Sequence, residues 1–267
     1  MPKKREEELG GRMSFLEHLE ELRRRLVVSA ATIFFVFAVV VLIPVFNQPL
    51  IQTISDFFLA PLREAIKGRG TLQFTAPFEG FVFQLKLAGI VSVFLASPML
   101  FYQFWKFVAP GLYRNERGYL LPFLLFSTLL FVGGAAFGYF FMFPATFGFF
   151  ATFASDWIQF NPKLNEAFSF AIWALIGFGV VFEMPLVALV LARMGVLTVG
   201  FMTHNFKYAI VAIFILAAVL TPGPDVFSQC LLAFPMLALY GVSLLVVWIF
   251  GKKKKPEPEA TPQEPAG

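Results

Sequence analysis

The sequence predicts an all-α polytopic membrane protein with six transmembrane helices. Hydrophobic residues fill 58% of the 267 positions and charged residues only 14%, whereas soluble domains carry about 25% charged residues. Long apolar runs alternate with short clusters of basic residues, a pattern typical of membrane spans and their loops. The 37 phenylalanines also exceed what a soluble core of this size needs. The bilayer is therefore the expected solvent for most of the chain.

Six apolar segments mark the expected helices. A hydrocarbon core about 30 Å thick needs about 20 helical residues, and the first four segments meet that length. The sixth is just long enough, whereas the fifth, with 13 residues, reaches only about 20 Å. The six segments are 26–46, 78–108, 119–143, 167–192, 208–220 and 231–250.

The spans are expected to form one domain, residues 14–250, between two disordered tails. The first tail, residues 1–13, does not resemble a cleavable signal peptide, because the apolar run that follows is too long and lacks a small-residue cleavage site. The second tail, residues 251–267, is rich in lysine, glutamate and proline, which disfavours a packed fold. In the outer loop, residues 47–77, short helices are expected around Pro61.

The distribution of basic residues predicts the orientation of the spans. Seven lysines and arginines precede the first span, three follow the second, two follow the fourth and four lie in the last tail. The loops on the other side hold four. Because loops rich in lysine and arginine stay in the cytoplasm, both termini are expected there.

The segment before the first span, SFLEHLEELRRRL, is expected to be an amphipathic helix at the membrane interface. Ser14 and Glu17 have the spacing of a capping box, and leucines recur at helical spacing. Glu21 lies four residues before Arg25, the favourable order for an ion pair. Such pairs either neutralise each other at the membrane boundary or, in the functional interpretation, leave Glu21 to bind a partner.

The link between the second and third spans reads FVAPGLYRNERGY. Pro110 ends the preceding helix, which leaves Glu116 in a tight cytoplasmic loop beside Arg114. This loop is either a solvated turn with a local ion pair or part of a binding site. In the second interpretation, Glu116 and Glu21 are two carboxylates that accept two guanidinium groups from a partner.

Glu183 lies inside the fourth apolar run, two residues before Pro185. A charge near the centre of a spanning helix costs about 2.5–3.5 kcal/mol, so such residues face a cavity or a partner. Pro185 is expected to kink the helix beside it. The alternative is a neutral glutamic acid that is hydrogen-bonded inside the bundle.

Two further patterns in the second and third spans have structural interpretations. Glu79 is expected at the outer boundary, with Lys86 on the same helix face reaching towards it. Gly134 and Gly138 have the spacing of close helix packing.

The turn between the fifth and sixth segments is too short to form an outer domain. Thr221, Asp225, Ser228 and Gln229 place polar groups at the outer end of this hairpin. Polar side chains can bridge helices in a membrane, so a further membrane helix is expected to dock there. The alternative is a capped turn, with Asp225 as the N-terminal carboxylate of the last helix.

The residues present also argue against several chemistries. Cys230 is the only cysteine and His18 and His204 are the only histidines, which leaves no cysteine- or histidine-based metal site. The sequence lacks a phosphate-binding loop and the motifs HExxH, GxSxG and GxGxxG. Neither a catalytic residue, a cofactor, a metal nor a nucleic-acid partner is expected.

Five blocks of the sequence resemble the TatC family, the receptor subunits of the twin-arginine protein translocase, from about residue 14 to residue 250. The blocks are HLEELR (18–23), APL (60–62), FVAPGLYRNE (107–116), FEMP (182–185) and DVFSQ (225–229). The resemblance implies a curved, glove-like wall of six helices in a bacterial inner membrane, with short fifth and sixth helices. The turn 222–224 is longer than in some relatives.

The resemblance also implies roles for residues in the shared blocks. The residues of the signal-peptide site would be Glu21, Glu116, Arg23, Phe107 and Pro110. Glu183 would face the concave side of the wall, and Pro61 and Asp225 would hold outer-loop positions that matter in the family. Thr221 and Gln229 would dock a TatA- or TatB-type helix.

The function that the resemblance implies is a non-enzymatic receptor for the export of folded proteins with twin-arginine signals. It implies TatA- and TatB-type partners, a homo-oligomer within the complex and, in the absence of a nucleotide site, the proton motive force as energy source. A short hairpin is also expected to thin the bilayer. Two alternatives are an ion-coupled small-solute transporter that uses Glu183 and a structural scaffold that uses neither acid.

Overall fold

The computed structural model describes residues 15–45, 48–68, 70–108, 120–221 and 225–251. The tail expected at 1–13, the capping residue Ser14, and all of the tail expected at 251–267 except Gly251 therefore lie outside the described residues. Nearly all the described residues are helical. The helices are α2 (Phe15–Leu42), α3 (Leu50–Ile66), α4 (Glu79–Val108), α5 (Leu120–Phe137), α6 (Phe143–Ala151), α7 (Leu164–Phe182), α8 (Met184–Arg193), α9 (Val199–His204), α10 (Phe206–Leu220) and α11 (Val226–Phe250).

Within the described part of the chain, five helical stretches are long and apolar enough to cross a membrane. A sixth apolar helix, α10, is shorter, with 15 residues. A π-helical turn, Gly138–Met142, joins α5 to α6. Two antiparallel strands of two residues each, β1 (Pro44–Val45) and β2 (Gln48–Pro49), precede α3. The predicted all-α class with six apolar helices is confirmed.

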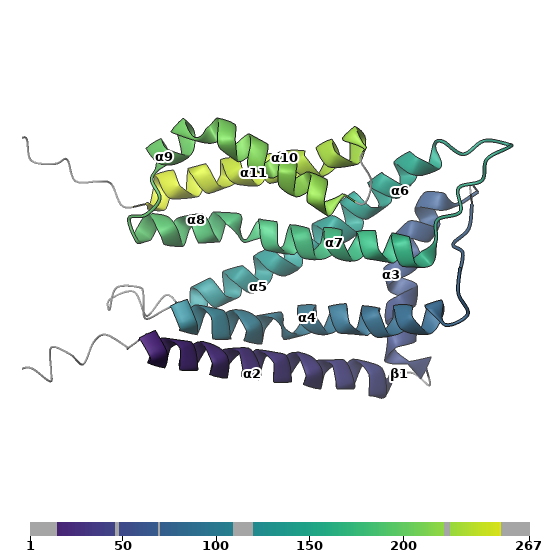
Figure 1. Cartoon of the computed structure of the whole chain (residues 1–267), viewed down its shortest axis with the longest axis horizontal. Coiled ribbons are helices and arrows are strands. Elements are labelled where there is room, and N and C mark those ends of the chain that lie inside the picture. Colours follow the sequence, from purple (N-terminus) through teal and green to yellow (C-terminus); the bar gives the residue numbers. More distant parts are fainter. Residues whose placement is uncertain (1–14, 46–47, 69, 109–119, 222–224, 252–267) are drawn as a thin grey trace, which may run out of the picture.

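The helices lie side by side as an open wall rather than around one closed core (Figure 1). In the order of their contacts, α2 packs on α4, α4 on α5, α5 on α7, and α8 and α10 on α11. The edge helix α2 packs mainly on α4, and Val40 is its only fully buried residue among those described. The wall therefore offers much of its apolar surface to lipid.

The segment expected at the membrane interface is continuous with the first span. Helix α2 starts at Phe15 and runs unbroken for 28 residues. No proline or glycine interrupts it, and the charged turns are compatible with helix because Glu21 and Arg25 pair one turn apart. The segment is helical, as expected, and it forms the first turns of the first spanning helix.

The expected close packing at Gly134 is confirmed. A Cβ at Gly134 would lie 2.4 Å from the carbonyl oxygen of Phe178, and one at Gly138 would lie 3.3 Å from that of Ala174. Gly134 on α5 and Gly138 at the start of the π-helical turn thus both pack closely against α7. The neighbouring Gly133 faces open space, because a methyl group added there would meet nothing within 4 Å.

Gly134→Ala should therefore destabilise the wall by about 1–3 kcal/mol, because backbone must shift to admit the methyl group. Gly133→Ala is the matched control and should be neutral or stabilise slightly, since alanine favours helix over glycine. Thermal unfolding of both variants in detergent measures the difference. Equal midpoints for the two variants would contradict the packing described here.

Pro61 lies inside α3, which is one helix of 17 residues rather than the short helices expected around Pro61. Because proline has no N–H group, it cannot donate to the carbonyl of Phe57 four residues earlier. The Tyr139 hydroxyl donates to that carbonyl oxygen instead, and the Phe57 and Tyr139 rings stack at 5.0 Å. The proline thus frees the acceptor by which α3 is tied to the π-helical turn.

The fifth spanning helix, α10, is short, as the length of its apolar segment predicted, but the sixth, α11, is not. Helix α10 spans about 22 Å at 1.5 Å per residue, whereas α11 has 25 residues and spans about 37 Å. Helix α11 begins at Val226, five residues before the apolar segment, because Asp225 caps it by accepting the Ser228 N–H at 2.7 Å. Figure 1 shows the α10–α11 hairpin stopping short of the end where α3 lies.

Glu79 and Lys86 do not form the direct contact expected of them. The Glu79 carboxylate accepts the Asn165 N–H at 2.9 Å, and Lys86 donates to the side-chain oxygen of the same asparagine at 3.1 Å. Glu79 also accepts hydrogen bonds from Thr75 and Ala76. Both side chains therefore hold the start of α7 against the start of α4.

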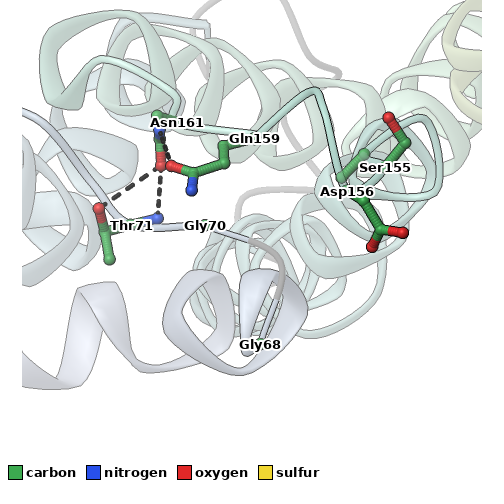
Figure 2. A pocket seen from close by; sticks show the side chains of 8 residues that line it. Gly68, Gly70, Thr71, Ser155, Asp156, Gln159 and Asn161 are labelled. Atoms are coloured by element: carbon green, nitrogen blue, oxygen red, sulfur yellow. Dashed lines mark hydrogen bonds between the residues drawn. The ribbon is translucent and has the colours of Figure 1, made fainter.

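Two loops pair at this end of the wall. Backbone bonds join Gln73 to Pro162 and Leu164, and Thr71 N–H donates to Asn161 Oδ1 at 2.9 Å. A Cβ at Gly70 would lie 1.7 Å from the Phe160 carbonyl oxygen, so only glycine fits this approach. Figure 2 shows the shallow polar hollow that the loops enclose.

Candidate functional site

Helix α2 begins, and helices α4 and α8 end, at one end of the wall (Figure 1), and basic residues recur in these terminal turns. We call this the basic end. Its described basic residues are Arg23, Arg24, Arg25, Lys106, Arg193 and Lys207. At the opposite end, the exposed cations lie beside acids, as in the pairs Arg63–Asp56, Lys67–Glu64 and Lys163–Glu166.

Glu21 is tied to its own helix and, through it, to α4. Arg25 Nε donates to Glu21 Oε1 at 3.1 Å, and Arg25 Nη2 donates to the same oxygen. Arg25 Nη1 reaches across to Gln103 Oε1 on α4 at 3.3 Å. The two charged side chains are 20% and 12% exposed. The expected Glu21–Arg25 pair is confirmed, and it is largely withdrawn from solvent.

A small pocket of about 190 Å³ opens beside this pair. Glu21 Oε2 is buried and has no hydrogen-bond partner among the described residues. A buried carboxylate oxygen without a donor is costly, so Glu21, which lines the pocket, keeps an unused acceptor for a cation or hydrogen-bond donor. The lining residues are Glu21, Arg24, Arg25, Val28, Gln103 and Lys106.

An aromatic contact closes the α2–α4 seam beyond this pocket. The rings of His18 and Phe107 stack with centroids 4.4 Å apart. His18 lies one turn before Glu21, and Phe107 lies in the last turn of α4. This contact places the last turn of α4 beside the first turns of α2. Pro110 and Glu116 in the link 109–119 lie outside the described residues, while Arg23 is exposed on α2.

Glu183 interrupts the fourth span, as expected from Pro185. Helix α7 ends at Phe182 and α8 begins at Met184. Ser127 on α5 lies beside the Glu183 side chain, and Trp105 Nε1 on α4 donates to Ser127 Oγ at 2.7 Å. Glu183 Oε1 is buried with no partner within the described ranges. Polar side chains from three neighbouring spans, Trp105, Ser127 and Glu183, thus lie together within the apolar wall.

The polar groups of the α10–α11 hairpin mostly bond within the hairpin. Thr221 Oγ1 donates to the Ala217 carbonyl at 2.7 Å, and Gln229 Nε2 donates to that of Phe214 at 3.0 Å. Asp225 Oδ2 and Ser228 Oγ are buried, and neither has a partner in the part of the chain that is described. The capped-turn interpretation of Asp225 is confirmed, and the unpaired atoms adjoin the residues expected to dock a helix.

Sequence reasoning missed Gln103 and the Trp105–Ser127 pair. Gln103 is four residues before Phe107 and therefore on the same face of α4, a signal that could have placed it near the site. Trp105 and Ser127 lie on different helices, 22 residues apart. No spacing rule connects such residues.

Comparisons with known proteins agree with this fold. A family model described as "Sec-independent protein translocase protein (TatC)" matches residues 17–235. The chain is 44% identical over 257 residues to a protein of this name from Desulforapulum autotrophicum, covering 96% of this chain and 90% of that one. For the relative from Koribacter versatilis the identity is 38%, with 91% and 88% covered.

A crystal structure of a "Twin Arginine Translocase Receptor- TatC" superposes with a TM-score of 0.74 at 31% identity. The superposition covers 87% of this chain and 99% of that one. A second structure of such a receptor, in DDM, gives a TM-score of 0.74 at 32% identity.

Proposed function

This chain belongs to the TatC family of Sec-independent protein translocase proteins, and on that premise we propose that its basic end is a receptor site for twin-arginine signal peptides. As a member of the family, the chain is a multi-pass membrane protein and a component of the twin-arginine translocase. The signal-peptide site, the partner proteins and the orientation in the membrane are proposed below.

The observation that carries the proposal is the half-used carboxylate of Glu21. It is a largely buried acid that lines a pocket at the basic end and, as far as the described residues go, keeps one buried oxygen without a hydrogen-bond partner. Planar guanidinium groups match carboxylates with two parallel hydrogen bonds, whereas an ammonium group acts as a point charge. A paired acid of this kind therefore selects arginine over lysine.

Glu116 is proposed as the second socket, because a twin-arginine signal offers two guanidinium groups. The His18–Phe107 stack holds the last turn of α4 beside the helical turn that precedes Glu21, and Glu116 follows Phe107 by nine residues in the sequence. Arg23, Phe107 and Pro110 are proposed as the supporting surface. Each charge-assisted contact contributes about 1.5–3 kcal/mol.

We propose that the basic end and both termini face the cytoplasm of a bacterial inner membrane, as the excess of lysine and arginine on that side favours. Transport would draw on the proton motive force, since one charge gains about 2.3 kcal/mol per 100 mV. TatA- and TatB-type helices would dock near Thr221 and Gln229, within a complex that holds several copies of the chain. Glu183, with the neighbouring Trp105–Ser127 pair, would face this assembly. Pro61 and Asp225 would hold outer-loop positions that the assembly needs.

Crosslinking of a signal peptide tests the receptor proposal. A peptide with a photoreactive residue directly after its arginine pair should label α2 and α4 around Glu21 and Gln103 in the intact chain. The matched twin-lysine peptide should label them at least tenfold less, because each lost fork removes a contact of about 1.5 kcal/mol or more. Equal labelling by the two peptides, or labelling at the α3 end of the wall, would contradict the proposal.

The same experiment separates the rival functions. A small-solute transporter that uses Glu183 would take up solute, lose uptake on Glu183→Gln, and show no preference for an arginine pair. A scaffold would show neither behaviour. Family membership does not favour either rival.

A further inference from the structure

We infer that Arg25 is an internal stand-in for a signal arginine: it occupies the Glu21 socket while no peptide is bound and is displaced when one binds. The inference deepens the proposed function and rests on it. It assigns to Arg25 a role in setting affinity, in addition to the neutralising role that its spacing from Glu21 predicts.

The chemistry of the resting contact is that of the proposed complex. The Arg25 guanidinium already binds the Glu21 carboxylate, but the two nitrogens that donate to Glu21, Nε and Nη2, both donate to Oε1. Fork-to-fork pairing uses both carboxylate oxygens and is the stronger geometry. Within the described residues Oε2 has no donor, so the resting pair leaves unused the half of Glu21 that an arriving arginine needs.

The charges around the pocket favour displacement over joint occupancy. The described lining holds one acid, Glu21, against three bases, Arg24, Arg25 and Lys106. A signal arginine that entered beside Arg25 would be a fourth cation in a space of about 190 Å³. Like charges at such separations repel strongly in a partly buried site. Movement of Arg25 out of the socket removes its share of that repulsion and leaves both oxygens of Glu21 available to the arriving arginine.

Gln103 gives Arg25 its second anchor. The bond from Arg25 Nη1 to Gln103 Oε1 joins α2 to α4, and Arg25 is only 12% exposed. Release of Arg25 from Glu21 would therefore also loosen a contact between the two helices. Binding at the socket is in this way coupled to the α2–α4 seam.

Titration of a fluorescent twin-arginine peptide onto the detergent-solubilised full chain tests the inference. Arg25→Gln removes the competitor and should tighten binding by roughly tenfold, the equivalent of one charge-assisted contact. The matched control is Lys207→Gln, which removes the same charge from an exposed residue of the basic end that does not line the pocket and should change the affinity by less than about twofold.

Arg25→Lys provides a second variant that keeps the charge beside Glu21 and guards against misfolding of the first. Lysine cannot engage Glu21 and Gln103 together through a fork, so its hold on the socket is weaker and peptide binding should tighten by roughly threefold. Thermal unfolding of each variant checks that the wall is intact.

Weaker or unchanged binding by both Arg25 variants would overturn the inference and would make Arg25 a residue that orients Glu21. The wild-type chain decides the proposed function separately. If it binds twin-arginine and twin-lysine peptides equally, the receptor proposal fails; if it prefers arginine but the Arg25 variants bind no tighter, only the stand-in role fails.

Discussion

Replacement of Glu21 and Glu116 together by glutamine is expected to weaken binding of a twin-arginine peptide by about 10²–10⁴-fold. Each carboxylate contributes one charge-assisted contact of about 1.5–3 kcal/mol, and 1.4 kcal/mol corresponds to a factor of ten. Glutamine keeps the size of the side chain and one acceptor oxygen, so the loss reports on charge and on paired hydrogen bonding. Equilibrium binding of the labelled peptide to the solubilised chain measures it.

Glu20→Gln is the matched control for this double variant. Glu20 is exposed on α2 directly beside Glu21, and its replacement removes the same charge from the same helical turn. It should leave the affinity within about threefold of the wild type, because exposed charges are screened by salt. A comparable loss in Glu20→Gln would mean that general attraction to acidic residues, not two defined sockets, holds the peptide.

Lengthening α10 by one helical turn is expected to abolish transport while leaving signal-peptide binding unchanged. With 15 residues, α10 spans about 22 Å, well short of a hydrocarbon core of about 30 Å. The bilayer must thin around such a helix, and we propose that this thinning helps partner subunits open a passage. Four added leucine or alanine residues restore about 6 Å of length.

The inserted turn is chosen so that the rest of the hairpin keeps its facing. Four residues rotate the helix by about 400°, which leaves the apolar face within about 40° of its original direction. The control carries the same four residues in the tail after Gly251, outside the spans. Export of a folded twin-arginine reporter and peptide binding are measured in both variants. Undiminished export with the longer α10 would remove the thinning hypothesis.

Local patterns in the sequence predicted the features of the fold that depend on neighbouring residues. Length alone identified α10 as too short to span a bilayer. The spacing of Gly134 and Gly138 predicted close packing, and the Phe178 carbonyl now shows which helix approaches. The position of Pro185 predicted the break at Glu183. Each of these depends on interactions within one or two turns of a helix.

Features that depend on contacts between distant segments were not predictable in this way. The Tyr139 hydroxyl bonds Phe57, 82 residues away, and Arg25 bonds Gln103, 78 residues away. The apolar segment 231–250 underestimated the length of the sixth helix, because the first turn of α11 after its cap at Asp225 contains polar residues. For the candidate site, the sequence pattern offered Glu21 as one of two interpretations and the family resemblance added Phe107, whereas the role of Arg25 depends on geometry that only the fold provides.

The central claim is that carboxylates at the basic end distinguish guanidinium from ammonium groups. Its most direct test is the ratio of the affinities for a twin-arginine and a twin-lysine peptide, measured in the wild type and in the Glu21→Gln, Glu116→Gln double variant. We expect a preference for arginine of at least tenfold in the wild type and a ratio near one in the variant. An equally strong preference for arginine in both proteins would contradict the claim.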